Sequence, residues 1–283
     1  MRHLIHGAAL WALLSTAALA ANFSPLVVTG YNFDGIVERT AAAPYSSVAQ
    51  NLDLSNHALF EIGLPGATAG GLPQGGLLSF TLNSNSYTFQ LGPYGNGATL
   101  SPNLLRVNPS GDLALATPGR FISVAVLGFS TVKNLPGGAE AVGDATLHFN
   151  DGSSSVYSGA INLSDWFITS PANPNVVVNA IGGLVNTTGG TAAAAFEANA
   201  GTGPKFYVCV VNLTAADASK LLTSVTIGNF AYGNTLQFVM GLAGSLPPSP
   251  SPVPALGTGM LALLALMLAA VGWLSVRRRA SSL

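Results

Sequence analysis

The sequence has few charged residues and almost no cysteine. Only 7% of its 283 residues are Asp, Glu, Lys or Arg, against roughly a quarter in an average soluble domain. Its one cysteine, Cys209, has no partner for an internal disulfide, so the fold must rest on its hydrophobic core. Four of the ten basic residues are terminal arginines, which leaves six against 11 acidic residues in between. A neutral to mildly acidic, hydroxyl-rich surface argues against a nucleic-acid partner.

The common catalytic motifs are also missing. There is no Gly-x-Ser-x-Gly, no His-Glu-x-x-His, no phosphate-binding P-loop and no dinucleotide fingerprint. Between the terminal segments, His57 and His148 have no second histidine or cysteine at the spacing of a zinc site. A glycosidase needs only two carboxylates on facing walls of a cleft, which sequence spacing does not exclude. The candidates for such a pair are Glu38, Glu61, Glu140 and Glu197. The pattern as a whole favours a protein without catalytic residues.

Apolar residues are abundant: they make up 49% of the chain, and its mean hydropathy is +0.46. Values this high indicate membrane segments. Residues 1–21 are typical of a secretory signal peptide. A basic start at Arg2 is followed by the apolar run Ala8–Leu14, and Ala18 and Ala20 form the small-x-small pattern that a signal peptidase cleaves. A retained membrane anchor is the alternative, although the run is shorter than the ~20 residues of a spanning helix.

The C-terminal part predicts a linker and a membrane helix. Residues 245–254 are rich in proline and serine and favour an extended spacer. Residues 255–283 form the tail, in which 256–276 carry no charge and would span about 31 Å as a helix. Arginines at 277–279 follow directly, and by the positive-inside tendency they stay in the cytoplasm. The sequence therefore predicts a single-pass anchor with the preceding domain outside.

The tail also resembles a known class of sorting signal. The resemblance is carried by Val253, Pro254, Ala255 and Leu256, then the apolar helix, then Arg277, Arg278 and Arg279. This order is similar to the tripartite IPTL-CTERM and PEP-CTERM tails that bacterial exosortases recognise. Ala255 departs from both patterns, which have Thr or Glu at this place. The resemblance implies that a membrane transpeptidase cleaves near residues 253–256 and passes the domain to the outer surface or matrix of a Gram-negative bacterium. A plain membrane anchor is the alternative.

Residues 22–244 show the signals of a β-rich domain. Short alternating or β-branched runs recur between clusters of Gly, Asn, Asp, Ser and Pro, and no window has a convincing helical period. The pattern predicts a hairpin of 78–82 with 87–91, a second hairpin across the Asp-Gly of 150–153, and a central strand within 120–129. Long surface loops are expected at 63–76 and 182–203. A dozen or so strands predict an all-β fold, an antiparallel β-sandwich of jelly-roll type.

Three short stretches resemble bacterial galactose-binding-like sandwiches: 30–35, 149–153 and 164–167. Many modules of that fold bind glycans, so the resemblance implies a search for exposed aromatic residues near loops. An aromatic ring stacks on the apolar face of a sugar, and a neighbouring polar group fixes its hydroxyls. The candidates are Tyr45, Tyr94 and Trp166 with Asp165. The alternative for Trp166 is that it closes the end of the sandwich core.

No cofactor is implied by the sequence, but calcium is an open hypothesis. Asn32 with Asp34, and Asn150 with Asp151, lie in turns where carboxylate and carbonyl oxygens can converge on the ion. The alternative is that these residues are present because tight turns require Asn, Asp and Gly.

Two classes of function remain open on sequence alone, with a secreted glycan-active enzyme as a third. The first is an exported structural or adhesive protein of the cell surface or a biofilm matrix. The second is a carbohydrate-binding module in the same place, with a surface polysaccharide as its partner. A pocket with exposed aromatic residues would favour the second.

Overall fold

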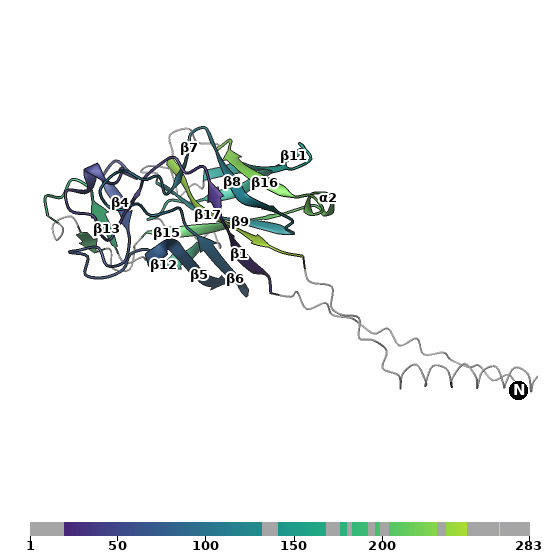
Figure 1. Cartoon of the computed structure of the whole chain (residues 1–283), viewed down its shortest axis with the longest axis horizontal. Coiled ribbons are helices and arrows are strands. Elements are labelled where there is room, and N and C mark those ends of the chain that lie inside the picture. The colour runs from purple at the N-terminus through teal and green to yellow at the C-terminus, as the bar shows by residue number, and fades with distance from the viewer. Residues whose placement is uncertain are drawn as a thin grey trace, which may run out of the picture. The chain divides into compact units, whose positions relative to one another are not determined.

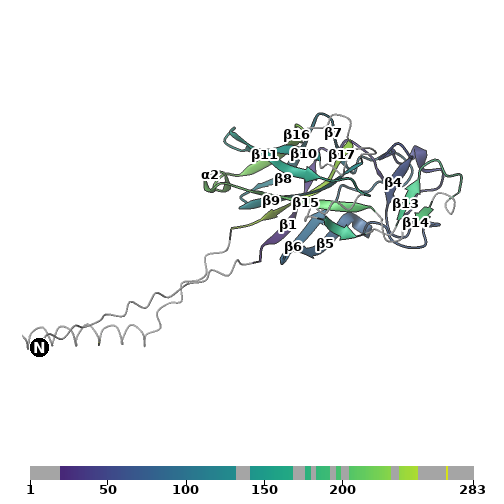
Figure 2. The same cartoon turned by 180° about the vertical axis from the view of Figure 1, so that it is seen from behind.

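The structure is a computed structural model in which residues 20–131, 141–167, 176–179, 183–191, 196–198, 204–230, 236–247 and 266 are described; for 176–179 and 196–198 only the backbone is described. Contacts divide the chain into two units, Met1–Leu246 and Pro247–Leu283. The described part of the first unit is mostly β-strand, which confirms the all-β prediction (Figures 1 and 2).

The largest sheet has eight strands and forms one wall of the main core. In spatial order its path is β12 (Val176–Asn179), β15 (Lys205–Asn212), β9 (Ser123–Thr131), β17 (Leu236–Ser245), β1 (Asn22–Leu26), β6 (Asn85–Gln90) and β5 (Leu77–Leu82), with β7 (Leu105–Val107) also paired to β17. All pairs are antiparallel except β1 with β6. Every residue of β9 is buried, so the predicted central strand is confirmed.

A second sheet of five strands shares this core. Its order is β11 (Ser154–Leu163), β10 (Ala141–Phe149), β16 (Leu222–Gly228), β8 (Ser110–Gly119) and β2 (Val28–Thr29). Along β10 buried residues alternate with more exposed ones, so one face of this sheet is covered and the other meets solvent. Leu147 and Ile227 from this sheet belong to the same hydrophobic cluster as Val126 and Phe238 from the larger one. The two sheets therefore enclose one core.

A third, smaller sheet has its own core. Its order is β14 (Phe196–Ala198), β13 (Gly183–Asn186), β4 (His57–Phe60) and β3 (Ile36–Val37), and β3 and β4 run parallel. Phe60 and Val185 from this sheet, together with Tyr45 of the 3-10 turn η1 (Tyr45–Ser47), belong to a separate hydrophobic cluster. Figures 1 and 2 show β4 and β13 at one end of the domain and β11 at the other.

Both predicted hairpins are present. Asn83 and Ser84, at φ +50° and +66°, make a two-residue turn between β5 and β6, because such a turn matches the strand twist when both φ angles are positive. Strands β10 and β11 pair across residues 150–153. The predicted surface loop at 182–203 is wrong in part, since it contains β13 and β14.

The only α-helix among the described residues of the domain is one turn long. The helix α2 (Ala215–Ala218) begins after Thr214, whose side chain accepts a hydrogen bond from the Asp217 backbone N–H at 3.2 Å. Thr214 is therefore the N-terminal cap of this turn.

The predicted terminal segments lie outside the described residues, apart from single positions. The signal cleavage residue Ala18, the linker beyond Pro247, the sorting motif and the basic end are not described; Ala20 is exposed, and Leu266 is helical. Within the described ranges, no helix has both the length and the apolar character needed to cross a bilayer.

Candidate functional site

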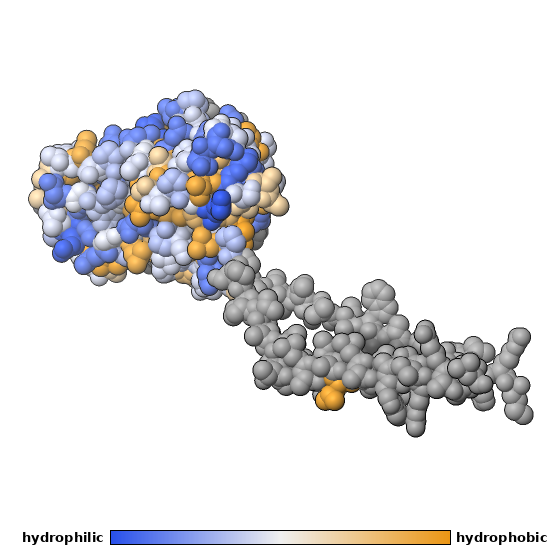
Figure 3. All heavy atoms as spheres, turned by 45° about the vertical axis from the view of Figure 1, so that its right-hand side comes forward, coloured by the Kyte–Doolittle hydropathy of each residue, from blue (hydrophilic) through white to orange (hydrophobic). Residues whose placement is uncertain are grey.

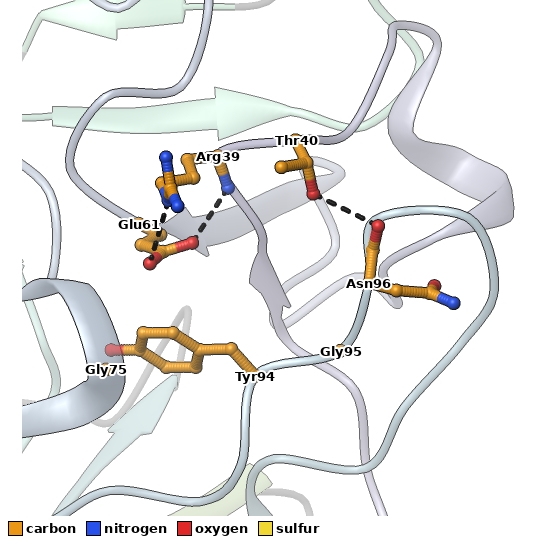
Figure 4. A pocket seen from close by; sticks show the side chains of 7 residues that line it. All are labelled: Arg39, Thr40, Glu61, Gly75, Tyr94, Gly95 and Asn96. Atoms are coloured by element: carbon orange, nitrogen blue, oxygen red, sulfur yellow. Dashed lines mark hydrogen bonds and ion pairs between the residues drawn. The ribbon is translucent and has the colours of Figure 1, made fainter.

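A pocket of about 430 Å³ opens beside the small third sheet, within the ~300–1,000 Å³ range of small-molecule sites. Four separate chain segments meet there, and Figure 4 shows the residues that line it. They are Arg39, Thr40, Glu61, Gly75, Tyr94, Gly95 and Asn96. Elsewhere on the domain, Figure 3 shows a face on which polar and apolar residues are interspersed.

The parallel pairing of β3 and β4 builds the first wall. Val37 is in register with Phe60, so the residues that follow the two strands also run side by side. The Arg39 backbone N–H donates to Oε2 of Glu61 at 3.0 Å, and Nε of Arg39 lies 3.7 Å from Oε1 of the same carboxylate. The Arg39 side chain is 52% exposed and that of Glu61 only 8%. The pair therefore presents a cation and an anion at the edge of one pocket.

The second wall is a loop, residues 92–103, whose two ends meet. A Cβ atom at Gly92 would lie 2.0 Å from the carbonyl oxygen of Asn103, so only glycine permits this approach. Asn103 is anchored in turn by its backbone N–H, which donates to the Phe33 carbonyl at 3.0 Å. The closed loop carries Tyr94 and Asn96 to the pocket.

Side chains that precede and follow β3 hold this loop in place. Glu38 accepts a hydrogen bond from the Gly95 backbone N–H at 2.7 Å, and the Thr40 hydroxyl donates to the Asn96 carbonyl at 3.0 Å. Asp34 accepts from the Asn103 side-chain amide at 2.7 Å and from the Ser101 backbone N–H. The loop is thus attached along its length to one short stretch of chain, residues 34–40.

Burial changes the acidity of two of these carboxyl groups. Asp34 and Glu38 are each only 1% exposed. Removal from water raises the pKa of Asp34 to about 6, with the nearby charge of Glu38 adding to the shift. Burial is also the main cause that raises the pKa of Glu38, and the charge of Glu61 acts in the same direction. The three carboxyl groups therefore influence one another through a poorly solvated wall.

Two buried polar atoms at this wall lack a hydrogen-bond partner among the described residues. They are Oε2 of Glu38 and the hydroxyl oxygen of Tyr94. Burial, with a contribution from Glu61, raises the pKa of Tyr94 well above its usual value, so the hydroxyl stays protonated and keeps a donor. In Figure 4 the Tyr94 ring lies across the pocket from the Arg39–Glu61 pair.

Of the predicted glycan-binding aromatic residues, the structure places only Tyr94 in this pocket. Trp166 is 1% exposed, and its ring stacks on Phe129 with centroids 5.3 Å apart. The prediction that Trp166 is a sugar platform is therefore wrong, and its alternative role in closing the core is what the structure shows. Tyr45 is fully buried in the smaller core. Asp165, which is 9% exposed, accepts from the Phe167 backbone N–H at 2.8 Å and so shapes its own turn.

The predicted calcium ligands hold turns and loops instead. Oδ1 of Asn32 accepts from the Arg106 backbone N–H at 2.7 Å, while Asp34 holds the loop described above. Asp151 accepts from both the backbone and the hydroxyl of Ser153, and the Asn150 backbone N–H donates to the Leu221 carbonyl. These contacts favour the turn interpretation. In the described part of the chain, no group of three His, Cys, Asp or Glu side chains could hold a metal ion.

The remaining reactive side chains also have structural contacts. Cys209 is 2% exposed, and its thiol lies 3.2 Å from both the backbone N–H and the carbonyl of Asn162. His57 pairs with Asp53 at 2.7 Å, and His148 lies 2.8 Å from the Thr226 hydroxyl. Cys209 is thus a buried residue of β15.

Sequence reasoning missed most of the pocket. Arg39, Thr40, Gly75 and Asn96 belong to no motif, and Glu61 stood out only as a carboxylate. They come from segments up to 57 positions apart, so no local pattern marks them as neighbours.

The fold and the pocket define a β-rich domain with a small polar site that contains one aromatic ring. No family model, no curated protein and no solved structure matches this chain.

Proposed function

We propose that this chain is an exported protein of the cell surface or extracellular matrix, and that its β domain binds glycans in the pocket around Tyr94. The observation that carries the proposal is the arrangement of one aromatic ring opposite a donor and an acceptor, Arg39 and Glu61, in a pocket of sugar size. An adhesive role in a matrix follows from such binding.

The chemistry of the lining suits a hydroxyl-rich ligand. A sugar ring has an apolar face of C–H groups, which an aromatic ring can cover, and a rim of hydroxyls that both donate and accept. Tyr94 supplies the ring, Glu61 the acceptor and Arg39 the donors, and Asn96 adds an amide at the rim. The loop that carries Tyr94 is fixed by Glu38 and Asp34, so little ordering is needed on binding.

A jelly-roll sandwich is part of the same proposal. The mostly antiparallel strands and the core shared by the eight-stranded and five-stranded sheets support it. Jelly rolls occur among lectin domains, although fold does not fix function.

The proposal that the domain is delivered to the cell surface is supported by the terminal segments of the sequence. The signal-like residues 1–21, the apolar run 256–276 and the basic end 277–279 support export followed by anchoring through a membrane helix. The motif at Val253–Leu256 supports removal of this anchor by an exosortase-type transpeptidase.

A glycan array tests the binding. The exported domain is expected to bind at least one class of surface polysaccharide, and Tyr94→Ala to reduce the affinity by tenfold or more, because a stacked ring contributes about 1–2 kcal/mol. Tyr94→Phe keeps the ring and should retain most of the affinity. Tyr157→Ala is a matched control, since this tyrosine is also partly buried but lies on β11 at the other end of the domain.

An array without any bound glycan, or binding that Tyr94→Ala leaves unchanged, would overturn the glycan proposal. Display of the β domain as a structural component would then be the function that the sequence still supports.

A further inference from the structure

We infer that the pocket selects neutral glycans and rejects acidic ones such as chains of uronic acids. The inference rests on the proposed function and names the chemical class of its ligand. It comes from the balance of charge around the pocket and from the contacts of Arg39, the basic residue that lines it in the described part of the chain.

Negative charge outnumbers positive charge at this wall. Glu61 lines the pocket directly, and Glu38 lies behind Gly95, to whose backbone N–H it is bonded at 2.7 Å. Asp34 lies on the same stretch of chain, close enough for the charge of Glu38 to raise its pKa. Among the described residues, Arg39 is the single basic one that lines the pocket. An incoming carboxylate therefore meets a net negative surface.

Burial strengthens this effect. Glu61 is 6% exposed and Glu38 1% exposed, so water and salt screen their charges poorly. Oε2 of Glu38 has no hydrogen-bond partner among the described residues, which leaves its charge uncompensated on that side. A neutral hydroxyl can donate to the carboxylate of Glu61, which lines the pocket, whereas a ligand carboxylate is repelled by it.

Arg39 is poorly placed to offset this repulsion by binding the carboxylate of an acidic ligand. Its Nε lies 3.7 Å from Oε1 of Glu61, and its backbone N–H already binds Oε2 of the same carboxylate. A ligand carboxylate that binds the other N–H groups of the guanidinium would share this cation with Glu61 and lie close to that buried anion. A pair of sugar hydroxyls faces no such cost, because one can donate to Glu61 while the other accepts from Arg39.

The test uses matched pairs of ligands. Each neutral oligosaccharide on an array is presented beside the same oligosaccharide oxidised at C6 to the uronic acid, so that only a CH₂OH and a carboxylate differ. The exported domain should bind the neutral member of a pair at least about fivefold more tightly, the factor expected from one ~1 kcal/mol like-charge contact. Equal or tighter binding of the acidic member would overturn the inference and leave the proposed function standing. If neither member of any pair binds, both fail.

Two charge variants locate the origin of the selectivity. Glu61→Gln keeps an acceptor for Arg39 but removes the charge. It should narrow the gap in affinity between the neutral and the acidic member of a pair. Arg39→Gln should widen it. Asp151→Asn is the matched control, because it removes the same charge from an exposed turn at the opposite end of the domain and should leave the gap unchanged. If the affinity ratio between the neutral and the acidic member of a pair stays the same in both pocket variants, the inference is overturned. Thermal unfolding of each variant shows whether it has folded.

Discussion

Glu38 and Gly95, 57 positions apart, are joined by a hydrogen bond of 2.7 Å from the Gly95 backbone N–H to the Glu38 carboxylate. This contact fixes the loop that carries Tyr94 against the stretch of chain that carries Arg39. A buried acid thus has a structural role beside a pocket at whose edge the half-exposed Arg39 meets solvent.

Removal of the Glu38 carboxylate should loosen the loop. In Glu38→Ala the Gly95 N–H loses its partner, so we expect faster hydrogen exchange at residues 94–101. The central strand β9 is the internal reference, because all its residues are buried and its exchange should not change. An unchanged Gly95 amide would show that the loop is held without this bond.

Stability should increase as the pH falls from 7 toward 5. Burial raises the pKa of Asp34 from 3.8 to about 6, so between these values the folded state binds more protons than the unfolded state. The contribution is fully present below pH 3.8 and is lost as the pH rises through about 6. A melting temperature that is higher at pH 5 than at pH 7, with a smaller difference in Asp34→Asn, is the expected result. A lower melting temperature at pH 5 would contradict it.

Stronger acid should reverse this trend. Burial tends to raise the pKa of Asp53, but the hydrogen bonds and charge of His57 outweigh it and lower the pKa below its usual value. The stability that this pair contributes is present above pH 3.8 and is lost as the pH falls through the lowered pKa. The melting temperature should therefore fall again as the pH drops below 3.8, as scanning calorimetry in acid can show. His57→Ala should weaken the decline.

Trp166→Ala should destabilise the domain without a specific effect on ligand binding. The side chain is 1% exposed and stacks on Phe129, so its loss leaves a cavity in the main core. Such truncations cost about 3–5 kcal/mol, measurable by urea unfolding. Trp166→Phe preserves a ring and should cost clearly less. A loss below 1 kcal/mol for the alanine variant would be at odds with the burial.

The thiol of Cys209 should be unreactive until the domain unfolds. It is 2% exposed on β15, with the Asn162 backbone 3.2 Å away. A thiol reagent such as Ellman's should label less than a tenth of the folded protein in the time that labels the urea-unfolded protein completely. Rapid labelling of the folded domain would mean that β15 opens readily.

Local sequence signals were enough for the strands that lie close to a turn. Alternation in residues 77–82 and 85–90 and the Asn83–Ser84 turn specify a hairpin without help from the rest of the chain. The same reasoning failed for residues 196–198, a strand within a segment rich in glycine and alanine that pairs with β13, which pairs in turn with β4. It failed for Trp166 as well, because exposure depends on whether Phe129 and its neighbours cover the ring.

By itself the sequence determined that this is an all-β domain, since strand period and turn residues act over a few positions. Only the tertiary structure decided that Arg39, Glu61 and Tyr94 share a pocket, because their meeting depends on two long-range events. One is the parallel register of β3 and β4, which places Arg39 beside Glu61. The other is the attachment of residues 92–103 to Asp34 and Glu38. Neither is visible in local sequence, as each joins segments that are distant along the chain.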